Sequence, residues 1–112
     1  MNDELFSVKG KNIVLTGSSG LLGSAYARSL LDRGANMALI DIKTNQSQII
    51  KKEFKEIDKI QVYNCDLSKP IQIKNTFKKI LKDFKTIDVL INNAAFASKQ
   101  TFHIKDFKNY ET

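Results

Sequence analysis

Residues 12–23 read NIVLTGSSGLLG, and this stretch decides the fold. Its first part, Asn12 to Thr16, is a short apolar run rich in β-branched side chains, which predicts a buried strand. The run stops at Gly17 and passes into a Leu- and Ala-rich segment, Leu21 to Arg33. Five residues of this segment fall at helical spacing, namely Leu22, Tyr26, Ser29, Leu30 and Arg33. Gly34 then supplies a helix stop. We therefore expect a strand, a glycine-rich turn and a helix, in that order.

The same alternation continues along the chain. Further apolar strands are expected at 36–42, 60–65 and 87–92. Further helices are expected at 44–57 and from Pro70 to about Lys85, the second with Ser68 as its N-cap. A loop is expected from Ala94 onward. Strands that are apolar on both faces and separated by helices predict a parallel sheet covered on both sides. Right-handed crossovers then give an α/β, Rossmann-type doubly wound sheet with strand order 3-2-1-4.

Composition limits the class of protein. The 112 residues suit one domain, and 42% apolar with 27% charged residues is typical of a globular chain. The net charge of +6 comes mainly from lysines mixed with acids, so we expect a solvated surface and no nucleic-acid partner. No apolar run approaches the ~20 residues of a membrane span, and we see no secretory signal. With Cys65 as the one cysteine, we expect a cytoplasmic protein.

The glycine-rich turn indicates a phosphate site. Gly17, Gly20 and Gly23 form a G-x-x-G-x-x-G pattern between a strand and a helix. The first can turn sharply out of the strand, the second lets a pyrophosphate approach, and the third lets the helix pack closely on the sheet. Free N–H groups and the positive dipole end favour phosphates there. The expected binding residues are Gly17, Ser19, Gly20, Leu21, Leu22 and Gly23. The alternative is three glycines that serve only the turn and the packing.

Asp41 lies at the end of the second expected strand, eighteen residues after Gly23. A carboxylate there can accept hydrogen bonds from both adenosine ribose hydroxyls. It would repel a 2′-phosphate by roughly 1–4 kcal/mol at ~4 Å, so NAD is expected to be preferred over NADP. Neither Ser18 nor Ser19 is basic, and Lys43 is expected to face solvent. A turn or capping role is the alternative for Asp41.

Two further strand ends carry polar or small residues. Asp66 could accept a hydrogen bond from the adenine amino group while Leu67 lines the ring, although Asp66 could instead be a turn residue before the helix. The neighbouring Cys65 is expected to be a buried apolar residue rather than a reactive thiol. At the end of the fourth expected strand, the small alanines of Asn92-Asn93-Ala94-Ala95 leave room for a flat ligand, and the Asn side chains can tie neighbouring loops together. A plain polar turn is the alternative.

Together these residues resemble the short-chain dehydrogenase/reductase family. The matching pieces are Thr16-Gly17, Gly20, Gly23, Asp41, Asp66-Leu67 and Asn92-Asn93-Ala94-Ala95, in the family's order. The resemblance implies an NAD(H)-dependent oxidoreductase that transfers hydride between nicotinamide and a carbonyl or alcohol of a small-molecule substrate. It implies that the glycine loop holds the pyrophosphate and Asp41 the ribose. It also implies that Asp66 and Leu67 border adenine and that Asn92 and Ala94 line the cofactor. The complete protein is expected to form a homo-oligomer.

The loop departs from the family's shorter-chain pattern. T-G-x-x-G-x-x-G is similar to the extended branch of sugar-nucleotide epimerases and dehydratases, whereas Asn-Asn-Ala-Ala is similar to the shorter-chain branch, with Ala95 in place of a glycine. We favour the shorter-chain branch. The combination also resembles oxidoreductases of bacterial surface-sugar pathways and flagellin modification.

The family's Tyr-x-x-x-Lys pair does not occur in this sequence, since Leu30 and Leu67 stand four residues after Tyr26 and Tyr63. No catalytic or metal-ligating residue is therefore assigned, and the single His103 is expected to be an exposed bystander. We interpret residues 1–112 as an NAD-binding Rossmann domain, the N-terminal part of an oxidoreductase truncated before its catalytic half. The alternatives are a non-catalytic dinucleotide-binding module, an inactive remnant, or a fragment of an extended-branch enzyme.

Overall fold

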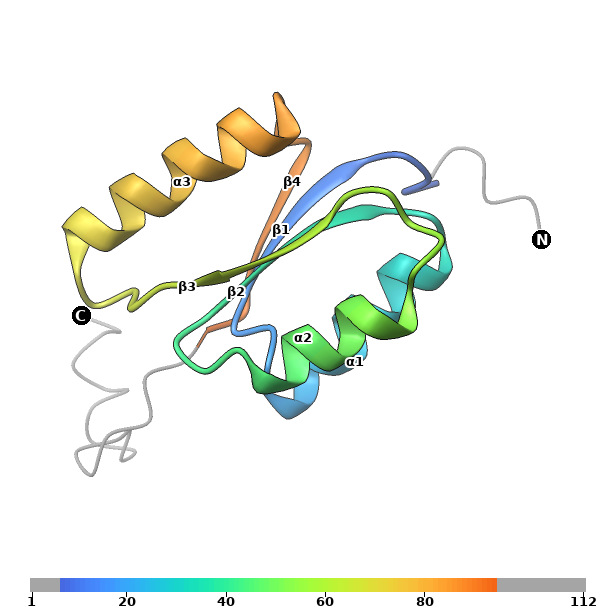
Figure 1. Ribbon diagram of the computed structural model, residues 1–112, viewed down its shortest axis with the longest axis horizontal. Coiled ribbons are helices and arrows are strands. Elements are labelled where there is room, and N and C mark those ends of the chain that lie inside the picture. The colour runs from blue at the N-terminus through green and yellow to red at the C-terminus, as the bar shows by residue number, and fades with distance from the viewer. Residues whose placement is uncertain (1–6, 95–112) are drawn as a thin grey trace, which may run out of the picture.

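The computed structural model describes residues 7–94, which alternate regularly between strands and helices (Figure 1). Each expected element is present. The strands are β1 (Asn12–Thr16), β2 (Asn36–Asp41), β3 (Ile60–Asn64) and β4 (Val89–Asn92), and the helices are α1 (Leu21–Asp32), α2 (Asn45–Glu53) and α3 (Pro70–Phe84). The expected loop from Ala94 onward and His103 lie almost entirely outside the described residues.

The four strands form one parallel sheet in the order β3-β2-β1-β4, which confirms the predicted topology. In this register Thr16 at the end of β1 lies between Ile40 of β2 and Asn92 of β4. The polar residues that follow these strands therefore come together at one edge of the sheet, because parallel strands end on the same side.

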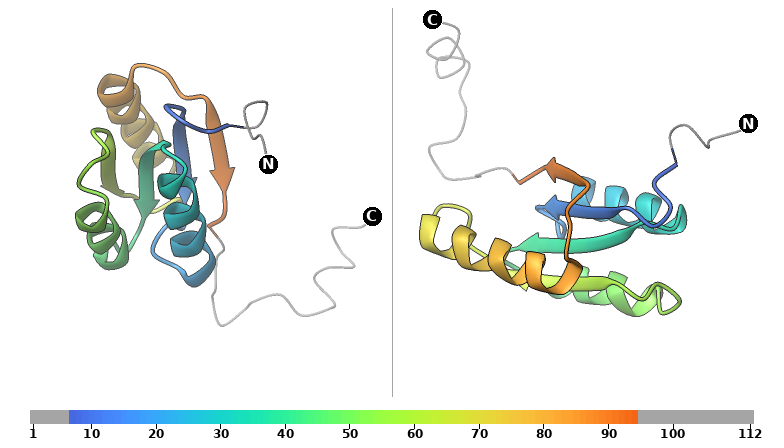
Figure 2. Two further views of the ribbon diagram at one scale, coloured as in Figure 1. Left: turned by 90° about the vertical axis from the view of Figure 1, so that its right-hand side faces the viewer. Right: turned by 90° about the horizontal axis from the view of Figure 1, so that it is seen from above.

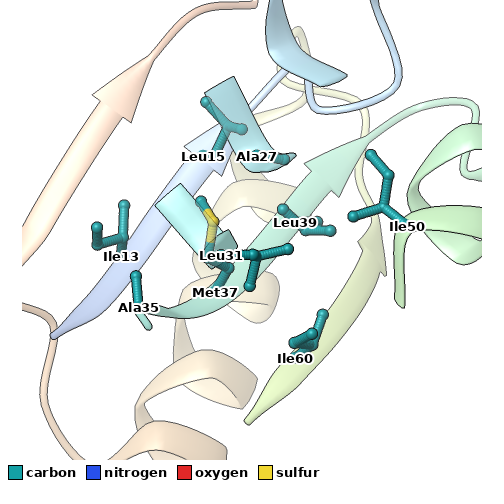
Figure 3. Packing of buried hydrophobic residues seen from close by; sticks show 9 residues of the cluster. All are labelled: Ile13, Leu15, Ala27, Leu31, Ala35, Met37, Leu39, Ile50 and Ile60. Atoms are coloured by element: carbon teal, nitrogen blue, oxygen red, sulfur yellow. The ribbon is translucent and has the colours of Figure 1, made fainter. Parts of the chain in front are cut away.

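Helices cover both faces of the sheet. Figure 2 shows α1 and α2 on one face and α3 on the other. Along β1 the side chains alternate, so that Ile13 and Leu15 pack in the cluster under α1 and α2 while Val14 packs under α3. Nine buried side chains make up the first cluster (Figure 3). Ile80 and Phe84 bring the apolar stripe of α3 into the second cluster.

Helix α1 buries a row of small residues. Gly23, Ser24 and Ala27 face the sheet together with Leu31, whereas Leu22 and Tyr26 are 60% and 41% exposed. The row of helically spaced residues that includes Leu22 and Tyr26 is therefore not the buried face. At Gly23 a side chain is excluded, because a Cβ there would meet the main chain of the glycine loop.

Two element ends differ from the predictions by more than one residue, and one cap differs as well. Helix α2 ends at Glu53 rather than at residue 57, and Phe54 caps it by donating its N–H to the Ile50 carbonyl. Strand β4 begins at Val89 rather than at residue 87. Ser68 is not the N-cap of α3, since that position belongs to Lys69. Helix ends depend on local capping contacts that apolar periodicity does not report.

Within residues 7–94, no helix has the length and apolar character that crossing a lipid bilayer requires. Strand β4 pairs with β1, and β1 is its one strand partner in this part of the chain. Leu90 on β4 is 55% exposed.

Candidate functional site

The glycine loop is fixed to the sheet by its main chain. The N–H groups of Gly17 and Ser18 both donate to the Ile40 carbonyl of β2, across 2.8 and 3.2 Å. Helix α1 begins directly after the loop, with Gly20 as its N-cap. The loop therefore crosses the carboxyl edge of the sheet and presents the N-terminus of α1 there.

Two of the three loop glycines are required by packing within the protein. Gly17 has φ +70°, and a Cβ placed there would lie 2.9 Å from the Cα of Ala94. A Cβ on Gly23 would lie only 1.9 Å from the carbonyl oxygen of Gly17. Both sites exclude a side chain because the end of β4 and the start of α1 approach the loop so closely.

Gly20 differs from the other two. Its φ of −73° suits any residue, and among residues 7–94 a Cβ there would meet one atom, the Gly17 oxygen, at an ordinary contact distance of 3.5 Å. Nothing in this part of the chain therefore requires glycine at this position. Within the described residues no side chain caps the first turn of α1. The open space beside Gly20, next to the uncapped N–H groups of α1, fits a phosphate group of a ligand.

Asp41 is tied to the loop. Its Oδ2 accepts a hydrogen bond from the Ser19 N–H across 2.9 Å, and its Oδ1 accepts from the Lys43 N–H across 3.3 Å. The Lys43 side chain is exposed, as expected. The carboxylate thus lies beside the glycine loop at the end of β2, where a ribose next to a loop-bound phosphate could reach it.

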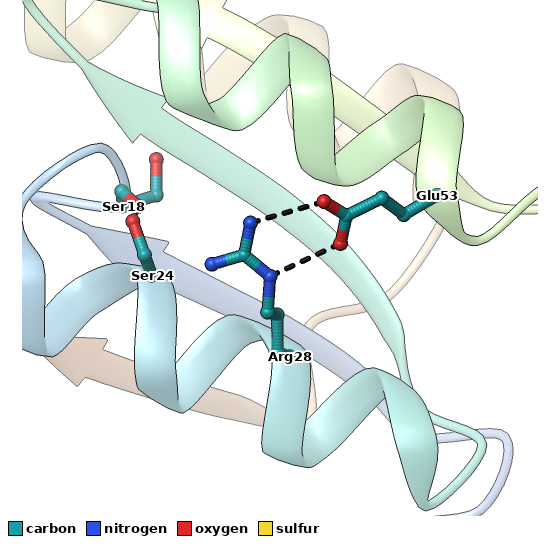
Figure 4. Close-up of polar contacts among 4 residues, drawn as sticks. All are labelled: Ser18, Ser24, Arg28 and Glu53. Atoms are coloured by element: carbon teal, nitrogen blue, oxygen red, sulfur yellow. Dashed lines mark hydrogen bonds and ion pairs between the residues drawn. The ribbon is translucent and has the colours of Figure 1, made fainter.

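Serine hydroxyls join the loop to α2, a contact that the sequence analysis missed. Ser47, in the first turn of α2, lies 2.7 Å from Ser18 and 2.8 Å from Ser19, measured between Oγ atoms. Ser24 of α1 donates its hydroxyl to the Ser18 carbonyl across 3.1 Å, and Figure 4 shows these two residues close together. A serine near a helix start is too common in sequences to have signalled this link.

A salt bridge also joins the two helices on this face. Arg28 of α1 makes two bonds to the carboxylate of Glu53 on α2, of 3.0 and 3.1 Å (Figure 4). Hydrogen bonding from Arg28 lowers the pKa of Glu53. The pair is solvent-exposed, so it orients the helices more than it stabilises them.

The end of β4 is held by Thr16. The Thr16 hydroxyl donates to Asn92 Oδ1 and accepts from the main-chain N–H groups of Asn93 and Ala94, all within 3.1 Å. Asn93 Nδ2 donates to the Gly17 carbonyl across 3.2 Å. The expectation that the asparagines tie neighbouring loops together is confirmed, and both Asn92 and Ala94 lie at the glycine loop.

Asp66 has the turn contacts of the alternative interpretation. Its Oδ1 accepts from both the N–H and the hydroxyl of Ser68, at 2.9 and 2.6 Å. These bonds lower the pKa of Asp66. Leu67 is half-buried against the α3 side of the core, and Cys65 is buried there as expected. Contact of Asp66 and Leu67 with adenine stays a prediction.

The described part of the chain contains no cluster of three or more His, Cys, Asp or Glu side chains that could hold a metal ion. The geometry is instead that of a glycine loop, a carboxylate and a strand end gathered at one sheet edge. The family model for short chain dehydrogenases matches residues 11–112. The chain belongs to the short-chain dehydrogenase family.

Relatives of this short-chain dehydrogenase chain include human 15-hydroxyprostaglandin dehydrogenase (NAD(+)), 32% identical over 98 residues that cover 85% of this chain and 37% of the relative. Among solved structures, NAD(+)-bound xylitol dehydrogenase superposes with a TM-score of 0.72 at 30% identity, covering 91% of this chain and 41% of that one. A metagenomic short-chain oxidoreductase in complex with NADP superposes with a TM-score of 0.73 at 30% identity, and the match covers 80% of this chain and 41% of that one.

The short-chain dehydrogenase chain thus spans less than two thirds of the length of these relatives. The predicted membership of the family is confirmed over nearly the whole sequence. The narrower resemblance to surface-sugar and flagellin-modification oxidoreductases stays a prediction.

Proposed function

We propose that the protein carrying this chain is an NAD(H)-dependent oxidoreductase and that residues 12–94 hold the adenosine and pyrophosphate half of the cofactor. The observation that carries the proposal is Gly20. Neither its backbone angles nor its protein neighbours require glycine, yet it stands at the uncapped start of α1. A phosphate that approaches the main chain accounts for both features.

The proposed binding residues surround that position. Gly17 and Gly23 shape the loop, and the N–H groups of Leu21 and Leu22 lie at the start of α1. Ser19, whose N–H donates to Asp41, lies beside them with its hydroxyl. Asp41 would take the ribose hydroxyls, and Asn92 and Ala94 would line the cofactor at the end of β4. Bound NAD would supply the hydride-accepting nicotinamide, and the chain would supply binding and orientation.

We propose NAD rather than NADP as the preferred cofactor, because the charge of Asp41 opposes a 2′-phosphate. Relatives of both kinds exist, since one is named for NAD(+) and one structure holds NADP. The substrate would be a small molecule with a carbonyl or alcohol group. The complete protein would be a cytoplasmic homo-oligomer.

Calorimetric titration of the purified protein, as its gene encodes it, tests the proposal. NAD should bind, and NADP should bind more weakly by about ten- to a thousandfold, as expected for roughly 1–4 kcal/mol of charge repulsion. Adding secondary alcohols to the NAD complex should then produce NADH absorbance for at least one of them. A folded protein that binds neither dinucleotide would overturn the proposal.

A further inference from the structure

The hydroxyl of Ser47 is the centre of a buried network between α2 and the glycine loop. Ser47 and Ser18 are both fully buried, whereas Ser19 is only partly buried. The Ser47 Oγ lies 2.7 Å from Ser18 Oγ and 2.8 Å from Ser19 Oγ. In addition, the Ser47 main-chain N–H donates to Ser19 Oγ across 3.3 Å, which satisfies one of the unpaired N–H groups at the start of α2.

Proton counting fixes the direction of this network. Ser47 has one hydroxyl proton and two hydroxyl neighbours, so it donates to one of them and accepts from the other. If it donated to Ser18, the Ser18 proton would have no acceptor, because Ser47 is the one side-chain partner of that hydroxyl in the described part of the chain. A buried hydroxyl proton without an acceptor is costly. The favoured order is therefore Ser18 to Ser47 to Ser19.

This order leaves Ser19 with one unused group. Its oxygen accepts from both the hydroxyl and the main-chain N–H of Ser47, which fills its two acceptor positions. Its own N–H already donates to Asp41. The Ser19 hydroxyl proton then remains available at the partly exposed loop, so Ser19 can act toward a ligand as a donor only.

We propose that Ser47 is a positioning residue for the nucleotide: it holds the Ser19 hydroxyl as a hydrogen-bond donor to an oxygen of the adenosine ribose or of its phosphate. The inference rests on the proposed function. Ser47 does not itself need to touch the ligand, since it acts by filling the acceptor positions of Ser19. If Ser47 had a purely structural role, it would stabilise α2, and the effect of its substitution on NAD affinity would not depend on whether Ser19 is present.

A double-mutant cycle separates the two roles. Ser47→Ala and Ser19→Ala should each weaken NAD binding by about three- to tenfold, the effect of one neutral hydrogen bond. The double variant should bind no more weakly than Ser19→Ala, because both changes remove the same contact. Ser24→Ala is the matched control: it removes another buried serine hydroxyl that bonds the loop, but one that does not contact Ser19, and affinity should change less than about twofold.

Each outcome decides the inference. Equal NAD affinity of Ser47→Ala and wild type, or fully additive losses in the double variant, would overturn it while leaving the proposed function intact. Folded wild-type protein that does not bind NAD would overturn the proposed function first. If Ser47→Ala unfolds, Ser47→Cys keeps the shape with a weak donor, and its affinity should lie below that of wild type.

Titration with adenosine and AMP identifies the oxygen that Ser19 meets. If Ser47→Ala weakens binding of both compounds, the donor meets the ribose. If it weakens AMP and NAD but not adenosine, the donor meets the phosphate. Unchanged binding of all three compounds contradicts the proposal.

Discussion

The main-chain N–H of Ser19 donates to Asp41 Oδ2, with 2.9 Å between nitrogen and oxygen. The two residues are 22 positions apart in the sequence, yet this bond joins the glycine loop after β1 to the end of β2. The glycine loop and the Asp41 carboxylate are therefore fixed relative to each other, and they would bind a phosphate and a ribose at a fixed spacing.

Asp41→Ala should weaken NAD binding by about tenfold and narrow its advantage over NADP, because the ribose acceptor and the charge opposing the 2′-phosphate are both lost. Asp41→Asn is the matched control, since it removes the charge but keeps an oxygen that can accept from Ser19. It should narrow the NAD preference while keeping more of the NAD affinity. Calorimetric titration with both dinucleotides measures this, and an unchanged preference would remove Asp41 from the ribose site.

Gly23→Ala should mainly lower stability, whereas Gly20→Ala should mainly lower NAD affinity. The first places a Cβ 1.9 Å from the Gly17 oxygen and should lower the free energy of unfolding by at least about 2 kcal/mol. The second places a Cβ at an ordinary 3.5 Å from the Gly17 oxygen and should lower the free energy of unfolding by less than about 1 kcal/mol. It should nevertheless abolish most NAD binding, because the new methyl group fills the space proposed for the phosphate.

Chemical denaturation and NAD titration, run on both glycine variants, measure the two effects separately. A Gly20→Ala protein that binds NAD like wild type would show that the space beside Gly20 is not where the phosphate lies. A Gly23→Ala protein of unchanged stability would contradict the close approach of α1 to the loop.

Asn12→Ala should destabilise the fold by about 2–3 kcal/mol. The Asn12 side chain donates to the carbonyl groups of Phe84 and Thr86, and its loss removes both hydrogen bonds from β1 to the end of α3 and the segment after it. Asn36→Ala is the comparison, because it removes the donor to Asn12 Oδ1 and an exposed bond to the Gly10 carbonyl while keeping the bonds that Asn12 donates, so its effect should be smaller. Denaturant unfolding measures both, and equal stabilities of the two variants would argue against the buried role of Asn12.

Tyr63 should make stability depend on pH in the alkaline range. Burial, followed by a 2.6 Å hydrogen bond to Asp83, raises the pKa of the phenol above its ordinary value. The unfolded chain therefore loses this proton first, so the stabilisation is complete below about pH 10 and decreases above it. Wild type should lose more stability than Tyr63→Phe as the pH rises above about 10. Parallel curves for the two proteins would exclude this contribution.

Some local features followed from short-range chemistry, whereas others required tertiary contacts. Helix α3 was predicted well because Pro70 can begin a helix and its apolar stripe repeats over several turns. Its cap was mispredicted, because Asp66 captures the hydroxyl of Ser68. The buried face of α1 was predicted only at Gly23. Ser24 and Ala27 were missed, because small residues carry little apolar weight in any periodicity although they are buried.

The sequence by itself determined the order of elements, the parallel sheet and the family, because apolar periodicity and glycine spacing are local properties that survive without knowledge of the fold. It also named Asp41 and the loop glycines. Only the tertiary structure decided that Gly20, unlike Gly17 and Gly23, has open space, and that Ser47 reaches Ser18 and Ser19. Those relationships depend on distances between segments that meet only when the sheet assembles, and no local pattern encodes such distances.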